Sequence, residues 1–123
     1  MISVQDVEQI HQVLISKFGG SQGIRDRQAL ESALSRPFQT FDGIDLYPDV
    51  ITKGASLLES ILINHPFVDG NKRTAYVVLR VFLLINGKDI HDSEDNKYEL
   101  IINVASGVAK FDEIVKWLRR TVF

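Results

Sequence analysis

The sequence has no cysteine, which excludes disulfide bonds, thiol catalysis and metal sites built from thiolates. It has three prolines in 123 residues and no repeat or Pro/Ser-rich stretch, so a linker or a disordered tail is not indicated. Its longest apolar runs are far shorter than a membrane span, and its first residues lack the basic start and apolar run of a secretory signal. We therefore expect a cytoplasmic protein with no membrane partner.

An excess of charge of one sign is also missing. The formal net charge is −2, which argues against a protein that binds nucleic acid through a broad basic surface. With 45% hydrophobic and 24% charged residues, the composition is typical of an ordinary globular protein. We predict a single domain over residues 1–123, long enough to bury its own core, and no direct nucleic-acid partner.

Apolar residues recur at helical spacing in six segments, which predicts an all-α fold. The expected helices span about residues 3–18, 27–35, 48–64, 74–86, 93–106 and 110–120. Ser3, Asp26 and Ser93 suit N-caps, whereas Gly19 and Gly87 suit helix ends. The segment 74–86 is rich in β-branched residues and would also suit a strand, but its length and the glycine after it favour a helix.

Residues 36–48 differ in kind, because β-prone residues such as Phe38 and Tyr47 flank the strong turn signal Asp42-Gly43. We predict a short β-hairpin flap, which must lean on helices because an isolated two-stranded hairpin is marginally stable. A plain connecting loop is the alternative. The expected fold is a bundle of about six helices with one short β-hairpin flap.

Several polar residues have structural interpretations. His11 lies near the apolar stripe of the first helix, where a packed or half-exposed side chain is expected. Three arginines are expected to be solvated or paired with Asp26 and Glu31. These are Arg25, Arg27 and Arg36.

The stretch from His65 to Ala75 gathers an imidazole, a carboxylate, an amide and two cations between two apolar segments. The helix that follows points its free amides and the positive end of its dipole at this stretch, which makes an anion site. Gly70 removes a side chain where an anion would approach the backbone. Lys72 and Arg73 oppose the dipole at a cost of roughly 0.3–1 kcal/mol each at exposed sites, which an anion such as phosphate would offset.

His65 and Asp69 add reactive groups to this anion site. Phosphate-bound Mg²⁺ favours one or two carboxylates, and His65 supplies a base near physiological pH. Together these groups fit phosphoryl or nucleotidyl transfer to a hydroxyl. Each has a structural alternative as a helix cap or a solvated charge, and Phe67 is expected to anchor the loop in the core. The crowding of all of them into nine positions favours the functional interpretation.

A zinc site is not expected, because a second nearby histidine is missing. A P-loop is not expected either, because the required glycine spacing is missing.

These residues resemble the signature of the Fic/Doc family, H-x-F-x-D/E-G-N-G-R-x-x-R. The chain matches it at His65, Phe67, Asp69, Gly70, Asn71 and Arg73, with Lys72 replacing the second glycine and Tyr76 replacing the last arginine. Asn-Lys-Arg at 71–73 is typical of the Doc (death-on-curing) branch. Residues 15–20, 36–37, 45–48 and 85–87 also resemble the Doc-type pattern, so the resemblance covers essentially the whole chain.

The resemblance implies a Fic-type helical bundle with the hairpin flap over the active site. It implies that His65 activates a side-chain hydroxyl of a protein target and that Asp69 holds Mg²⁺. It further implies that Gly70, Asn71 and Arg73, with Lys72 beside them, bind the phosphates of ATP. The flap would align the protein substrate by strand addition, and its residues are Thr40, Phe41, Asp42, Gly43 and Ile44.

Lys72 and Tyr76 bear on which phosphate is transferred. Doc-type proteins with this lysine are associated with binding ATP the other way round and with transferring its γ-phosphate to a threonine of elongation factor Tu, which arrests translation. The resemblance therefore implies a kinase-like toxin, with AMP transfer to a protein hydroxyl as the alternative. A non-catalytic interaction module is a second alternative, against which the intact His65 and Asp69 argue.

The resemblance also implies a separate antitoxin. Fic proteins that restrain themselves carry an S/T-x-x-x-E-G/N helix, and no glutamate of this chain is followed by glycine or asparagine. Restraint would then have to come from a second protein, as in Doc toxin–antitoxin pairs.

Overall fold

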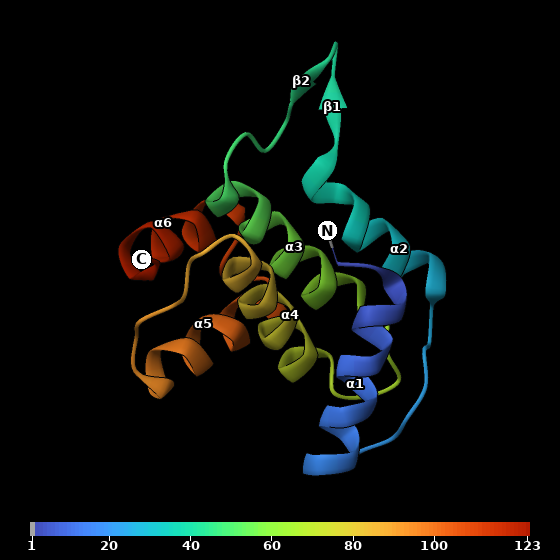
Figure 1. The fold of residues 1–123 in the computed structure, drawn as a ribbon. Coiled ribbons are helices and arrows are strands. Elements are labelled where there is room, and N and C mark those ends of the chain that lie inside the picture. Colours follow the sequence, from blue (N-terminus) through green and yellow to red (C-terminus); the bar gives the residue numbers. More distant parts are fainter. Residues whose placement is uncertain (1) are drawn as a thin grey trace.

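Residues 2–123, which the computed structural model describes, form six α-helices, one 3₁₀-helix and one two-stranded hairpin (Figure 1). The helices are α1 (Val4–Phe18), α2 (Arg27–Ser35), α3 (Val50–Asn64), α4 (Asn71–Ile85), α5 (Glu94–Ala105) and α6 (Phe111–Thr121). The 3₁₀-helix η1 (Arg36–Phe38) leads into the hairpin strands β1 (Thr40–Phe41) and β2 (Ile44–Asp45). The prediction of an all-α bundle with a short hairpin is confirmed.

Side-chain caps begin three helices as predicted. The Ser3 hydroxyl accepts from the amide of Asp6 at 3.1 Å, and the Asp6 carboxylate accepts from the amide of Ser3 at 3.0 Å, which completes a capping box. Asp26 and Ser93 accept from the amides three residues further on and cap α2 and α5. The first amides of a helix have no intrahelical partner, so these contacts fix where each helix starts.

Two helices begin elsewhere than predicted. α3 begins at Val50 rather than Pro48, because Asp49 is its N-cap and exchanges hydrogen bonds with Thr52. α4 begins at Asn71, three residues before the predicted start. Its N-cap is Gly70, which has φ 74° and offers no side chain, so the sequence carries no polar capping signal there. The earlier start places the whole cationic pair of the sequence motif inside the first turn of α4.

The hairpin is a two-residue turn between very short antiparallel strands. Thr40 pairs with Asp45 and Phe41 with Ile44. Asp42 and Gly43 both have positive φ, 52° and 76°, as a type I′ turn requires. Figure 1 shows the hairpin extending beyond the start of α3. It leans on α3 at its base, where Asp45 pairs with Lys53 at 3.6 Å, while Phe41 and Ile44 near its tip are exposed.

Arg36 anchors the base of the hairpin, contrary to the expectation that it is solvated or paired with Asp26 and Glu31. Its guanidinium donates to the Tyr47 hydroxyl and to the Glu59 carboxylate, each at 2.8 Å. Arg27 is exposed as expected, but it pairs with Glu8 of α1 at 2.5 Å rather than with Asp26 or Glu31.

α3 is the central helix of the bundle and packs against α2, α4, α5 and α6 (Figure 1). Its residues Leu58, Ile61 and Leu62 are fully buried. Gly54 lets α4 approach, since a Cβ there would lie 3.1 Å from a methyl of Leu79. Within residues 2–123 no helix has the length and apolar character needed to cross a membrane.

Candidate active site

A sharp bend at His65 carries the chain from the end of α3 toward the start of α4. His65 is the C-cap of α3 and has left-handed backbone angles of φ 46° and ψ 60°. A residue with a side chain rarely adopts this conformation, which costs of order 1–3 kcal/mol and persists only where the surroundings hold it. The His65 side chain remains exposed and lines a cleft between α4 and α5.

Arg25 holds this bend. It is exposed, as expected, but its partners are backbone carbonyls rather than Asp26 or Glu31. Its Nε donates to the carbonyl of His65 and its Nη2 to the carbonyl of Asn64, both at 2.7 Å. The cation thus lies at the C-terminal, negative end of the α3 dipole, where it is stabilising.

Asn71 closes the other end of the loop. Its side-chain oxygen accepts from the amide of Phe67 and its side-chain nitrogen donates to the carbonyl of Phe67, both at 2.9 Å. Phe67 is 1% exposed, so the predicted core anchor is confirmed. The Asn71 side chain is thereby held in place, and both its backbone amide and the second N–H of its Nδ2 can donate to an anion.

His11 supports the loop from α1. It is 2% exposed, its ring stacks on Phe67 with centroids 3.9 Å apart, and its Nε2 lies 2.8 Å from the carbonyl oxygen of Asp69. A carbonyl can only accept, so this nitrogen carries the hydrogen. The expectation of a packed histidine is confirmed, and the packing connects it directly to the loop.

The Asp69 carboxylate is exposed and charged. Its two oxygens accept from the amide of Ser21 at 3.1 Å and from the amide of Gly70 at 2.8 Å. These hydrogen bonds lower the pKa of Asp69 below its ordinary value, and the one from Ser21 has the larger effect. Each oxygen keeps a lone pair that is free for another ligand.

The start of α4 offers backbone donors. Among the described residues, the amides of Asn71, Lys72 and Arg73 have no hydrogen-bond acceptor. Gly70 keeps this terminus open and close to α1, since a Cβ there would lie 2.9 Å from Ile15 Cδ1. Such a group of free amides at a helix N-terminus suits an anion.

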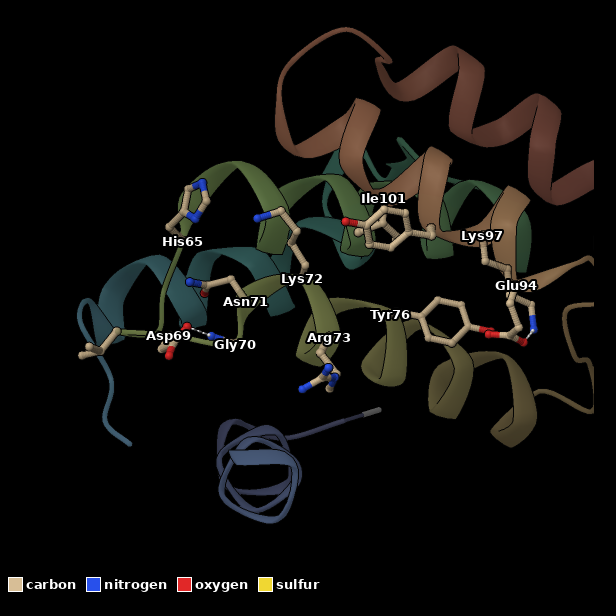
Figure 2. Close-up of a pocket in the computed structure, with 12 residues that line it drawn as sticks. His65, Asp69, Gly70, Asn71, Lys72, Arg73, Tyr76, Glu94, Lys97 and Ile101 are labelled. Carbon is tan, nitrogen blue, oxygen red and sulfur yellow. Dashed lines mark hydrogen bonds and ion pairs between the residues drawn. The ribbon is translucent and has the colours of Figure 1, made fainter. Parts of the chain in front are cut away.

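Figure 2 shows the cleft between the loop, α4 and α5. Its volume is about 550 Å³. His65 lies at one end and Glu94 with Lys97 at the other. The predicted residues that it brings together are His65, Asp69, Gly70, Asn71, Lys72 and Arg73. α5 contributes Glu94, Lys97, Tyr98 and Ile101.

The two cations of the motif point in different directions. Figure 2 shows Lys72 extending toward His65, whereas Arg73 extends toward α1. The Arg73 guanidinium lies 4.3 Å from the ring centroid of Phe18. This stacking fixes the side chain while leaving its N–H groups free, because a cation–π contact uses the face of the guanidinium.

The far end of the cleft is aromatic and electrically balanced. The Lys97 ammonium lies 3.2 Å from the Glu94 carboxylate and 5.7 Å from the ring centroid of Tyr76. Burial lowers the pKa of Lys97, but the neighbouring Tyr76 and Glu94 side chains outweigh it and raise the pKa above its ordinary value. The charges of Lys97 and Glu94 cancel, so the net positive charge of the cleft lies at the end with His65 and Lys72.

The donor set fits Mg²⁺ held together with a phosphate rather than a metal held by protein alone. No group of three or more histidine, aspartate or glutamate side chains that could form a metal cage occurs within residues 2–123. A single charged carboxylate beside free amides is the arrangement that Mg²⁺ uses when a substrate phosphate supplies other ligands. Asp69 is the residue that would hold it.

The hairpin is not part of the cleft. None of the residues predicted to align the substrate, Thr40, Phe41, Asp42, Gly43 and Ile44, lines it. Figure 1 shows the hairpin beyond the N-terminal end of α3, whereas His65 follows the C-terminal end. α3 has 15 residues. At 1.5 Å per residue the two ends are separated by roughly 20 Å.

Comparison with known proteins matches the part of the chain that carries this loop to a family. A family model described as the Fic/DOC family matches residues 1–83, which include the whole loop and most of α4. This chain belongs to the Fic/DOC family. The segment that matches the family model ends before α5. The side of the cleft that α5 forms therefore lies outside the matched segment.

Two relatives extend the comparison of this Fic/DOC chain. It is 41% identical over 99 residues to Toxin Doc of Mycolicibacterium smegmatis, covering 79% of this chain and 76% of the relative. It is 29% identical over 119 residues to Protein kinase doc of Escherichia phage P1, covering 97% of this chain and 93% of the relative. The resemblance to the Doc branch, drawn from the motif, is therefore confirmed.

Several residues around the site were not predicted to belong to it. Arg25, Ser21 and Lys97 come from separate parts of the chain, and no spacing in the sequence connects them to the motif. The one available signal was the cluster Gly19-Gly20 with Gly23, since a glycine-rich segment can run close to another loop. A Cβ on Gly20 would lie 2.7 Å from the Asp69 carboxylate.

Proposed function

We propose that this chain is a Doc-like toxin that transfers the γ-phosphate of ATP to a hydroxyl side chain of a protein. The target proposed is a threonine of elongation factor Tu, whose modification would arrest translation. A separate antitoxin would restrain the enzyme. The names of the two relatives, a toxin and a protein kinase, support this proposal.

The observation that carries the proposal is the polarity of the cleft. Free amides and Lys72 lie at the end with His65, whereas the far end is formed by Tyr76 and the neutralised Lys97–Glu94 pair (Figure 2). Phosphates favour the first end, and a nucleoside base favours aromatic surface. A nucleotide bound in this direction has its terminal phosphate nearest to His65.

The proposed chemistry needs little beyond positioning and charge. His65 takes the proton of the target hydroxyl, the hydroxyl oxygen forms a bond to the γ-phosphorus, and the bond between that phosphorus and the β–γ bridging oxygen breaks to release ADP. Lys72 and the amides of α4 stabilise charge on the phosphate oxygens. Asp69 would hold Mg²⁺, which when bound neutralises part of the phosphate charge. Arg73, stacked on Phe18, would supply a further guanidinium donor.

The hairpin has a more limited place in this proposal. Substrate alignment by strand addition would require a target that reaches along α3 to the cleft. The exposed side chains Phe41 and Ile44, 71% and 72% exposed, suit contact with a protein.

ATP labelled separately in the α- and γ-phosphates tests the proposal. With elongation factor Tu as acceptor, the γ label should appear on the target and the α label should not. His65→Ala should abolish the labelling. His91→Ala is the matched control, because His91 is an exposed histidine that packs on Phe123 outside the cleft. Labelling that persists in His65→Ala would contradict the proposed base.

AMP transfer remains the second candidate, on one specific observation. Lys97 of α5 places a cation at the far end of the cleft. It faces Tyr76 of α4, the residue that replaces the last arginine of the family signature. If Lys97 held the terminal phosphates, the α-phosphate would lie nearer to His65. The label experiment separates the two directions, and the absence of either label on any acceptor protein would support the non-catalytic module.

A further inference from the structure

We propose that Arg25 is a positioning residue that sets the orientation of His65. This inference rests on the proposed function of His65 as the base. Arg25 is exposed and does not line the cleft, so it does not touch the nucleotide site. It acts on His65 through the backbone, by hydrogen bonds to the last two carbonyls before the loop.

The contact uses the shape of the arginine side chain. Nε and Nη2 lie on one edge of the planar guanidinium, and each donates at 2.7 Å to one of two successive carbonyls, those of His65 and Asn64. Two parallel bonds fix both the distance and the angle of the peptide that follows α3. A lysine would provide the charge at the helix end but not the fork.

This bend is the place where such support is needed. His65 has φ 46°, one of only two positive φ values at residues other than glycine within the described residues. If its carbonyl lost the arginine, the backbone could relax toward ordinary helical or extended angles. Either change rotates the Cα–Cβ bond and moves the imidazole away from the end of the cleft.

Backbone hydrogen bonds keep the loop attached when the side chain is removed. The amides of Arg25 and Asp26 both donate to the Pro66 carbonyl, at 2.8 Å and 3.0 Å. The amide of Val68 donates to the carbonyl of Gly23 at 3.1 Å. None of these bonds involves the Arg25 guanidinium, so a side-chain variant should fold with the loop in place and only the His65 peptide released.

Steady-state phosphoryl transfer by Arg25→Met is the first test, with Arg27→Met as the matched control. Arg27 lies two residues further on and pairs with Glu8, away from the loop. Arg25→Met should lower kcat by about 10- to 100-fold, the effect of a misplacement of about 1 Å, while KM for ATP changes by less than about 2-fold. Arg27→Met should change neither. Unchanged kcat in Arg25→Met, or an equal loss in Arg27→Met, would overturn the proposal.

Rescue experiments separate positioning from general damage. Arg25→Lys should recover only part of kcat, because it restores charge without the fork. Guanidinium ion added to Arg25→Ala should raise kcat toward the wild-type value, whereas it should not affect His65→Ala. Full recovery by lysine, or no response to guanidinium, would contradict the bidentate role.

A readout without activity keeps this inference separate from the proposed function. The backbone ¹³C chemical shifts of His65 depend on its φ and ψ angles and can be measured by NMR in the full chain. They should change in Arg25→Met and stay unchanged in Arg27→Met. If the wild-type protein transfers nothing, the proposed function is wrong and the shifts alone decide on Arg25. If the shifts of His65 are the same in both variants, Arg25 does not position it.

Discussion

Two glycines with nearly the same backbone angle allow the role of the α4 N-terminus to be isolated. Gly70 has φ +74° and Gly87 has φ +75°. Alanine at either position must adopt a left-handed conformation, which costs about 1–2 kcal/mol. The surroundings differ, because a Cβ on Gly87 meets nothing within 4 Å, whereas one on Gly70 lies 2.9 Å from Ile15 Cδ1.

The expected loss of stability follows from these contacts. Gly87→Ala should lower the free energy of unfolding by about 1–2 kcal/mol, from the backbone alone. Gly70→Ala carries the same backbone cost plus about 0.5–1.5 kcal/mol for moving the Ile15 side chain off its rotamer. For a chain of this length each kcal/mol corresponds to roughly 3–6 °C in Tm. Urea unfolding of both variants and the wild type measures the difference.

Nucleotide binding should separate the two variants much more sharply. A methyl group on Gly70 presses on Ile15 and His11 of α1, so it pushes the start of α4 and its free amides out of place. The loss of one charged hydrogen bond to a phosphate weakens ATP binding by about 10- to 100-fold. Gly87→Ala should bind ATP as the wild type does. Wild-type ATP affinity in Gly70→Ala would refute the anion site, and an equal loss in Gly87→Ala would show that lowered stability is the cause.

Three further predictions concern single carboxylates and cations. Asp69→Asn should remove the Mg²⁺ dependence of ATP binding, measured by titration with and without Mg²⁺. Since the backbone amide of Ser21 holds the pKa of Asp69 below its ordinary value, wild-type Mg²⁺ dependence should persist at any pH above about 4. Hydrogen bonds from the Arg80 guanidinium, and secondarily from the backbone amide of Ile90, lower the pKa of Asp89 from 3.8 to about 2. A lowered folded-state pKa contributes stability above the unfolded value and loses it as pH falls. The stability gap between wild type and Arg80→Met should therefore be constant above pH 3.8 and close as pH falls toward 2, as acid-dependent urea unfolding would record. Arg36→Met should cost about 1.5–3 kcal/mol in urea unfolding, because it leaves Glu59, whose side chain is 17% exposed, without its charged partner.

The helices were predictable where their signals are local. The capping residues Ser3, Asp26 and Ser93 stand three positions before the amides that they accept, so sequence alone located the starts of α1, α2 and α5. The start of α4 was misplaced because its cap is a glycine that acts only through its backbone angle.

The candidate site was predictable where its residues are contiguous. His65 to Arg73 form one loop and one helical turn, so their neighbourhood follows from chain connectivity. The partners of Arg25 were not predictable, because they are backbone carbonyls 39 and 40 residues away and carry no sequence signal. Local sequence offers only the nearby carboxylates Asp26 and Glu31 as partners, because it does not encode the tertiary packing.

The placement of the hairpin shows the same limit. Asp42 and Gly43 specify the turn locally, and the turn was predicted correctly. Where the hairpin lies relative to His65 depends on the direction of α3, which no local pattern encodes.

The most direct test of the central claim is the intact mass of elongation factor Tu after incubation with ATP, Mg²⁺ and this protein. The direction of the cleft predicts a gain of one phosphate group, lost when His65→Ala replaces the wild type and retained with His91→Ala. A gain of one AMP would reverse the direction proposed for the nucleotide. An unchanged mass would contradict elongation factor Tu as the target.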